Sequence, residues 1–297
     1  MSPQHRVPSD RYEVLSLLCS PDDSPALEQW IAQTYQIPVL VQGEDPCQIS
    51  FTPPSDESLE RWLLEEALRS LGARDIQSES YERQDWQELW KEQGFKRFTV
   101  GESLTVVPAW DPDPVLPPSI RIDPQLAFGT GWHETTLCCL ERILERAGRE
   151  GACGRVLDFG CGTGILGIAA LRIDPGASLL AIDNDPYAVL ATEENLRLNG
   201  MAARGKILLG DGDLFSDSMK PDTVFDLVVA NVTGSVLIQM AAILWNRVAS
   251  EGWLICSGVA GEEAAAVEGV LRGISPSFRD FPGNRYNTYL LSREGFR

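Results

Sequence analysis

Histidine is scarce in this sequence, and the cysteines lack the spacing of a metal or disulfide framework. Only two of the 297 residues are histidines, His5 and His133, which excludes a histidine-rich metal site. The 7 cysteines are an odd number and include no C-x-x-C pair. Cysteines scattered in this way are typical of small buried side chains in a reducing compartment, not of disulfides or zinc sites. We therefore expect a protein without a metal ion.

Long hydrophobic runs are also missing. No apolar run reaches the roughly 18 residues that a membrane-spanning helix needs. The first ten residues are polar and lack the apolar region of a signal peptide. We therefore expect a cytoplasmic protein that does not enter the membrane.

Positive charge is the third shortage. The chain has 25 Lys and Arg residues against 43 Asp and Glu residues, so its net charge is −18. A surface of this sign repels phosphate backbones and attracts basic partners. We expect a basic partner and no direct binding of nucleic acid; acidity that only provides solubility is the open alternative.

The rest of the chain is organised around residues 156–166. An apolar run ends in Asp158, the glycines Gly160, Gly162 and Gly164 follow at every second position, and an apolar helical pattern begins. This pattern predicts a strand, a tight turn and a helix. Glycine allows positive φ and a close approach by a ligand, and the N-terminus of the helix offers free N–H groups.

Two ligands compete for this turn. Gly162, Gly164 and Gly167 match the G-x-G-x-x-G spacing of dinucleotide-binding folds, with Asp183 in place for a ribose. The stretch also resembles the first motif of class I methyltransferases, Asp-x-Gly-x-Gly-x-Gly, which binds S-adenosylmethionine (AdoMet). Asp158 suits the ammonium group of that ligand and would repel a pyrophosphate. AdoMet is therefore favoured, while a turn with only a structural role also stays open.

Further polar residues follow the predicted strands. Asp183 ends a buried strand over residues 178–182, and Asn231 ends another over residues 225–230. Open α/β sheets bind their ligands at the carboxyl ends of parallel strands, and an acid there can accept both ribose hydroxyls. Asp211, in a Gly-Asp cluster after a third strand, is a candidate for contact with the adenine, with an ordinary turn as the alternative.

The N-terminal part has a different pattern and predicts a separate domain. Residues 1–82 contain strand, helix, two strands, helix and strand, which suggests a small α+β, ferredoxin-like domain for substrate recognition. Residues 83–97 predict a linker helix with Trp86, Leu89 and Trp90 on one face. Residues 98–297 then form the larger domain, which closes with an antiparallel hairpin over residues 277–291.

A second informative stretch precedes the glycine turn. Residues 127–131 read Ala-Phe-Gly-Thr-Gly and lead into an apolar helix. Thr135 and Thr136 are expected in its first turn, where a hydroxyl can cap the helix or bind a ligand. Phe128 is a candidate for an aromatic contact with the cofactor.

Together these motifs resemble the bacterial ribosomal protein L11 methyltransferases, the PrmA family. The resemblance joins residues 127–136 to residues 158–166 and includes residues 183–186 and 229–232. It extends over about residues 85–261. This chain departs from the usual pattern around the histidine, where it has Trp132 and Glu134, and after the asparagine.

The resemblance implies a fold, an activity and a site. The fold would be α/β: a class I methyltransferase, Rossmann-like, mostly parallel sheet preceded by the small α+β domain. The activity would be AdoMet-dependent methylation of lysine side chains, the N-terminal amine, or both, on ribosomal protein L11, with S-adenosylhomocysteine as product. Asn231 would lie beside the methyl donor as the catalytic residue. The cofactor-binding candidates are Phe128, Thr130, Gly131, Thr136, Asp158, Gly160, Gly162, Gly164, Asp183, Asn184, Asp211 and Asn231.

Other functions stay open at this point. Gly162, Gly164, Gly167 and Asp183 also fit a nicotinamide-dependent oxidoreductase. The remaining alternatives are a methyltransferase with a different protein substrate, a nucleic-acid methyltransferase, and an adapter that binds AdoMet without catalysis.

Overall fold

The computed structural model describes residues 11–35, 40–42, 46–51, 58–82, 95–101, 103–113, 118–125, 131–148, 153–210 and 223–295. The chain divides into an N-terminal unit, Met1–Glu88, and a C-terminal unit, Leu89–Arg297. The division falls inside the stretch for which the sequence predicts a linker helix. Residues 95–97 of that stretch are not helical, and residues 83–94 lie outside the described residues.

The N-terminal unit is a four-stranded antiparallel sheet with two helices. Its elements are β1 (Arg11–Cys19), α1 (Ser24–Tyr35), β2 (Leu40–Gln42), β3 (Cys47–Phe51), α2 (Ser58–Ser70) and β4 (Arg74–Glu82). The strand order is β2-β3-β1-β4. The sequence predicts these six elements in this order, and we keep the ferredoxin-like assignment of the unit as a prediction.

Alternating side chains explain the core of this unit. Along β3, Cys47, Ile49 and Phe51 are buried, whereas Gln48 between them is exposed, as expected for a strand with one face on a core. On α1, Leu27 and Ile31 are four residues apart and both are fully buried. One hydrophobic cluster therefore joins the helices to a single face of the sheet.

The C-terminal unit contains two sheets. Its first elements form a three-stranded sheet of order β5-β6-β7: β5 (Phe98–Val100), β6 (Leu104–Pro108) and β7 (Ser119–Ile122). The elements of the larger part are α4 (Glu134–Ala147), β8 (Arg155–Phe159), α5 (Ile165–Ile173), β9 (Ser178–Asp183), α6 (Pro186–Leu198), β10 (Gly205–Leu209), β11 (Phe225–Asn231), α8 (Gly234–Asn246), β12 (Val248–Ala260), α9 (Ala264–Ile274), β13 (Phe278–Pro282) and β14 (Tyr286–Ser292).

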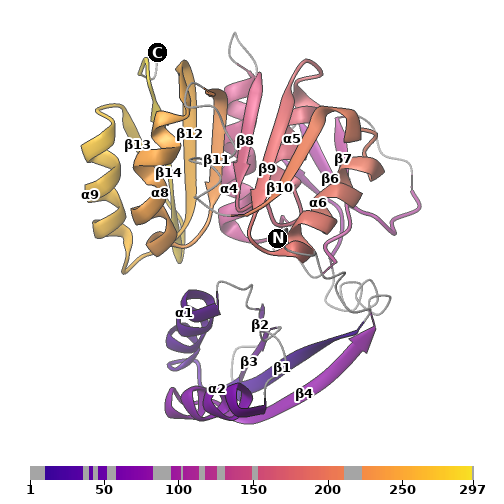
Figure 1. Cartoon of the computed structure of the whole chain (residues 1–297), viewed down its shortest axis with the longest axis vertical. Helices are drawn as coiled ribbons and strands as arrows, with labels where there is room; N and C mark the ends of the chain where they lie inside the picture. Colours follow the sequence, from indigo (N-terminus) through magenta and orange to yellow (C-terminus); the bar gives the residue numbers. More distant parts are fainter. Residues whose placement is uncertain are drawn as a thin grey trace, which may run out of the picture. The chain divides into compact units, whose positions relative to one another are not determined.

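The larger sheet has the order β10-β9-β8-β11-β12-β14-β13 (Figure 1). Strands β8 to β12 run parallel to one another, while β14 is antiparallel to both β12 and β13. The predicted antiparallel hairpin after the alternating strands and helices is therefore confirmed. The apolar pattern of the sequence predicts a helix over residues 235–248, but α8 ends at Asn246 and Val248 begins β12.

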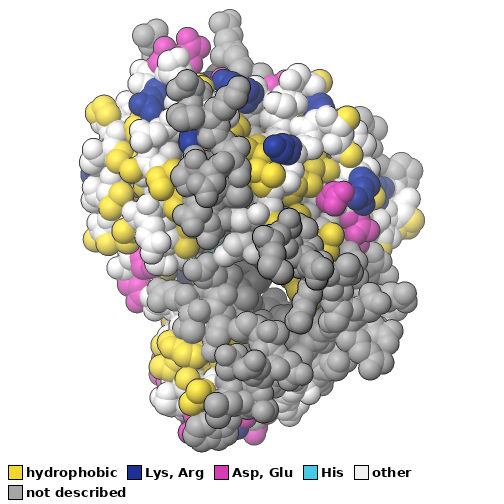
Figure 2. All heavy atoms as spheres, viewed as in Figure 1, with side chains coloured by type: hydrophobic (Ala, Val, Ile, Leu, Met, Phe, Trp, Pro, Cys, Tyr) yellow, Lys and Arg dark blue, Asp and Glu magenta, His cyan; other side chains and the backbone are white. Residues whose placement is uncertain are grey.

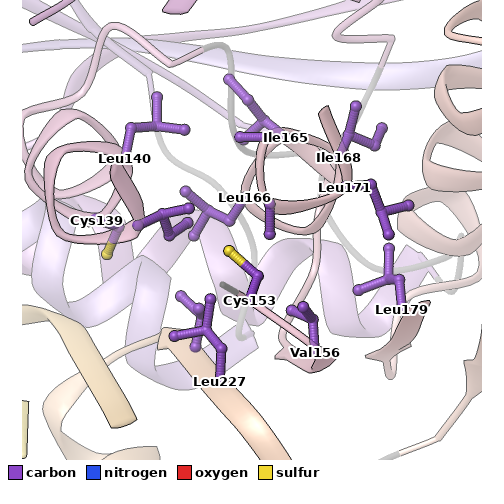
Figure 3. Close-up of a cluster of buried hydrophobic side chains, with 14 of the residues drawn as sticks. Cys139, Leu140, Cys153, Val156, Ile165, Leu166, Ile168, Leu171, Leu179 and Leu227 are labelled. Atoms are coloured by element: carbon purple, nitrogen blue, oxygen red, sulfur yellow. The ribbon is translucent and has the colours of Figure 1, made fainter. Parts of the chain in front are cut away.

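Helices cover both faces of the larger sheet, because its central strands are hydrophobic on both faces (Figure 1). Along β11, Leu227 and Val229 face the core shared with α4, α5 and α6. Val228 and Ala230 face the core shared with α8 and α9. Figure 3 shows part of the first core, where side chains of α4 and α5 lie over Leu227 and other residues of the sheet.

The three-stranded sheet packs against helices α4, α5 and α6. Its buried side chains, such as Val106 and Ile120, belong to the same hydrophobic core as those of α4 and α5. The backbone in and just after β7 is also bonded to Asn195 of α6 and to Asn199, the residue that caps the end of that helix. The side chain of Asn199 pairs with both backbone groups of Arg121, and that of Asn195 pairs with both of Asp123. These side-chain amides bond to the edge of the sheet that β7 forms, where a further strand would otherwise pair. The sequence does not predict β7.

Candidate functional site

The glycine turn between β8 and α5 has the conformation that its sequence predicts. Gly160, Gly162 and Gly164 all have positive φ, at 71°, 54° and 76°. A Cβ on Gly164 would lie 2.8 Å from Cγ2 of Thr192, and one on Gly160 would lie 2.5 Å from Cγ1 of Val232. Both positions therefore require glycine for space as well as for φ. Gly164 is the N-cap of α5, so the free N–H groups of that helix begin at the turn.

Asp158 lies under this turn and is almost fully buried, with 1% of its surface exposed. Its Oδ2 accepts a hydrogen bond from the backbone N–H of Gly167 at 2.9 Å, whereas its Oδ1 has no hydrogen-bond partner. Burial raises the pKa of this carboxyl to about 7, and repulsion from Asp183 adds to the rise. A buried carboxylate oxygen without a partner suits a ligand that carries a positive charge or an N–H group.

Asp183 holds the other side of the turn. It ends β9, its Oδ2 accepts from the N–H of Gly162 at 2.9 Å, and its Oδ1 accepts from the N–H of Asp185 at 3.0 Å. Burial raises the pKa of this carboxyl too. The two acids that the sequence predicts as ligand groups are therefore brought to one turn. Asn184, the next candidate, is exposed beside them.

Helix α6 supports the turn from behind, which the sequence analysis missed. The hydroxyl of Thr192 donates to the carbonyl of Gly162 at 2.9 Å. The amide of Asn195 donates to the carbonyls of Thr163 and Asp123 at 3.0 and 2.9 Å. Because Asn195 is fully buried, it ties the glycine turn directly to the segment after β7. In the sequence, the only indication of this support is that two polar residues, Thr192 and Asn195, lie among apolar residues of the helix.

Asn231 ends β11 at the same edge of the sheet and contacts the first turn of α4. Its Nδ2 donates to the hydroxyl of Thr136 at 3.3 Å. Thr135 and Thr136 are both buried in this turn, as the sequence predicts for the first turn of the helix. The N-cap of α4 is His133, whose Nδ1 accepts from the N–H of Thr135 and lies 2.8 Å from its hydroxyl oxygen.

The segment before α4 is described only in part. Gly131 is buried, with φ of 92°, and a Cβ there would lie 2.6 Å from Cζ of Phe98. Three candidates from the sequence, Phe128, Thr130 and Asp211, lie outside the described residues.

The two residues that depart from the family pattern have different environments. Trp132 is 53% exposed, its indole N–H donates to the carbonyl of Lys96, and its ring meets that of Phe98 edge-on. The carboxylate of Glu134 accepts from backbone N–H groups of the turn between β13 and β14. Glu134 is thus a structural contact of α4.

The described part of the chain carries neither a metal cluster nor a membrane-spanning helix. In these residues, no group of three or more His, Cys, Asp or Glu side chains could hold a metal ion. None of the helices described is both long and apolar enough to cross a membrane.

The strand order, the closing antiparallel hairpin and the glycine turn between the buried Asp158 and the half-buried Asp183 define a class I methyltransferase fold. The profile of the family described as ribosomal protein L11 methyltransferase (PrmA) matches residues 41–278. The chain therefore belongs to the family of ribosomal protein L11 methyltransferases. This membership disfavours the nicotinamide-dependent alternative.

Individual relatives agree with the family match. The chain is 35% identical over 263 residues to a ribosomal protein L11 methyltransferase of Halorhodospira halophila, covering 82% of this chain and 84% of that relative. It is 36% identical over 197 residues to one of Alteromonas mediterranea, where the match spans 64% of this chain and only 61% of the relative. A crystal structure of a ribosomal protein L11 methylase from Lactobacillus delbrueckii subsp. bulgaricus is 33% identical, with a TM-score of 0.55, and covers 67% of this chain and 98% of that chain.

Proposed function

We propose that this chain is an AdoMet-dependent protein methyltransferase that methylates lysine side chains, the N-terminal amine, or both, on ribosomal protein L11. The family match over residues 41–278 carries the proposal. Its relatives from two bacteria bear the name of this activity. A basic ribosomal acceptor also suits a chain with a net charge of −18. A ribosomal acceptor would place the activity of this protein in the cytoplasm.

The described residues of the site fit AdoMet. The unpartnered, buried Oδ1 of Asp158 suits a cationic ligand. The oxygens of Asp183 accept backbone hydrogen bonds from Gly162 and Asp185, and a carboxylate has about four lone-pair sites, which leaves room for ribose hydroxyls. When bound, AdoMet supplies a methyl group on a positively charged sulfur and leaves as S-adenosylhomocysteine.

Asn231 is proposed to hold the acceptor amine beside the methyl donor, with its own amide oriented by Thr136, a candidate for cofactor binding. The Nδ2 of Asn231 is engaged by the Thr136 hydroxyl, which fixes the plane of the amide and orients Oδ1 as an acceptor for an N–H group. A lysine amine has an unperturbed pKa of about 10.4, so it must lose a proton before it attacks the methyl group. Alignment of the amine and exclusion of water then supply most of the rate enhancement.

The first experiment measures the intact mass of purified ribosomal protein L11 after incubation with this chain and AdoMet. A ladder of methyl increments is expected. If AdoMet binds in a separate titration but the mass of L11 does not change, the substrate assignment is wrong. The same assay on other basic proteins then tests the alternative of another protein substrate, and no transfer to any of them would favour an adapter.

Substitution of the asparagine tests the site within the same assay. In Asn231→Ala we expect kcat to fall by about 100-fold, because a misaligned amine loses much of the benefit of positioning. The Kd for AdoMet, measured by calorimetry, should change much less. Equal losses in kcat and in AdoMet affinity would instead assign Asn231 to cofactor binding alone.

A further inference from the structure

Glu134 makes an unusual set of contacts for a residue at the start of a helix. Its Oε2 accepts from the backbone N–H of Asn284 at 2.8 Å. Its Oε1 accepts from the N–H groups of Arg285 and Tyr286 at 2.9 and 3.0 Å. Three consecutive backbone donors of the turn between β13 and β14 therefore converge on one carboxylate.

The turn is shaped to receive this carboxylate. Successive N–H groups that point to one place form a concave site for an anion, and the charge makes each hydrogen bond stronger than a neutral one. Gly283 begins the turn, with its N–H bonded to the carbonyl of Tyr286 at 2.9 Å. A Cβ on Gly283 would lie 2.4 Å from the backbone carbonyl oxygen of Tyr286 and 2.9 Å from Oε2 of Glu134, so the turn requires glycine there.

The same end of α4 carries the polar contact to Asn231. Glu134 is the first residue of the helix, and Thr136, two residues later, accepts from Asn231 Nδ2. The neighbouring His133 adds a second contact to the turn, with its ring edge-on to that of Tyr286 at a centroid distance of 4.9 Å. The first turn of α4 is thus held by β11 through Thr136 and by the hairpin through His133 and Glu134.

We propose that Glu134 is a positioning residue for methyl transfer: by fixing the hairpin turn to the start of α4, it sets where the Thr136 hydroxyl meets Asn231. The inference rests on the proposed function of Asn231 and goes beyond it, because Glu134 acts only through its neighbours. The departure from the family pattern at Glu134 then belongs to the support of the acceptor site and does not by itself indicate another substrate.

A double-mutant cycle separates this role from general stability. We expect Glu134→Ala to lower kcat on L11 by about tenfold through misplacement of Thr136, while the Kd for AdoMet changes less than twofold. In the Asn231→Ala background the same substitution should cost less than twofold, because the contact that it positions is already gone. Losses in kcat that multiply in the double variant would overturn the proposal.

Two matched variants sharpen the cycle. In Glu134→Gln the side-chain carbonyl can still accept from Arg285 and Tyr286, whereas its amide meets the N–H of Asn284, so an intermediate loss is expected. Glu141→Ala changes an acid of the same helix whose exposed side chain pairs with Arg142 at 3.3 Å. This control should retain wild-type kcat, and a loss equal to that of Glu134→Ala would overturn the proposal.

Hydrogen exchange provides a readout that needs no acceptor protein. In Glu134→Gln and Glu134→Ala, we expect faster exchange at the amides of residues 284–286 and at Leu137, which bonds to the carbonyl of His133. Unchanged exchange at Leu137 would overturn the proposal even if L11 is methylated. Failure of the wild-type chain to methylate L11, with exchange altered in both variants, would instead reject the proposed substrate and leave the structural coupling in place.

Discussion

At the scale of single residues, the burial of the Asp158 carboxyl predicts how the proposed cofactor site depends on pH. Burial raises its pKa to about 7, so in the free protein the neutral acid dominates below that pH. The pKa of Asp158 is therefore higher in the folded protein than its value of about 3.9 in the unfolded protein. The contribution of this carboxyl to stability is full below about pH 3.9 and is lost as the pH rises through about 7. A bound cationic ligand would instead stabilise the ionised carboxylate of Asp158 and so lower its pKa.

AdoMet binding should therefore release a proton and tighten as the pH rises. Below pH 7 we expect the Kd to increase by up to about tenfold per pH unit, and above pH 8 to level off. Calorimetry at pH 6, 7 and 8, in buffers of different ionisation enthalpy, measures both the affinity and the proton release.

Asp158→Asn provides the comparison for this measurement. The amide keeps the size of the side chain and cannot titrate, so the affinity should be lower and almost independent of pH. A wild-type Kd that stays constant from pH 6 to 8 would contradict the assignment of Asp158 as a group that senses the ligand charge.

At the scale of elements, helix α6 shows how one amphipathic segment fixes two loops. Asn195 and Asn199 lie one turn apart and both bond to the backbone around β7. Only Asn195 also reaches the glycine turn, through the carbonyl of Thr163. The two asparagines therefore form a matched pair for substitution.

Asn195→Ala should affect both stability and cofactor binding. It removes the three hydrogen bonds that the Asn195 side chain makes to the backbone of Asp123 and Thr163, at a cost of about 3 kcal/mol in the free energy of unfolding. Because the turn loses its support, the Kd for AdoMet should also rise. Asn199→Ala should lower stability while leaving the Kd for AdoMet unchanged. Denaturant unfolding and calorimetry on both variants check this, and equal changes in Kd would contradict it.

The same helix shows what the sequence could and could not predict. The order of the elements, the glycine turn and the positions of Asp158, Asp183 and Asn231 follow from local patterns: apolar periods, glycine spacing and strand ends. The roles of Asn195 and Glu134 do not, because their partners lie 72 and about 150 positions away in the chain. Strand β7 was missed for a related reason: it has four residues, and part of its pairing comes from side chains of α6.

At the scale of the whole molecule, the distribution of charge matters most for the acceptor. Residues 1–88 contain 6 Lys and Arg residues against 17 Asp and Glu residues, a net charge of −11 out of −18 for the whole chain. On the face shown in Figure 2, charged side chains of the described residues are scattered in small groups, and acidic and basic side chains adjoin on the right. The excess of acid in the smaller unit favours this unit as the docking site for a basic protein.

This distribution predicts that salt acts on the acceptor and not on the cofactor. Exposed charges are screened beyond about 10 Å at 0.1 M ionic strength, whereas the buried carboxyl of Asp158 and the half-buried one of Asp183 are screened much less. Raising NaCl from low to moderate concentration should therefore raise the KM for L11 several-fold and leave the Kd for AdoMet nearly constant. Steady-state kinetics across a salt series, with calorimetry alongside, makes the comparison. If KM for L11 stays constant while the Kd for AdoMet rises, docking does not depend on the acidic surface, and the contacts of the acceptor must be sought among apolar residues.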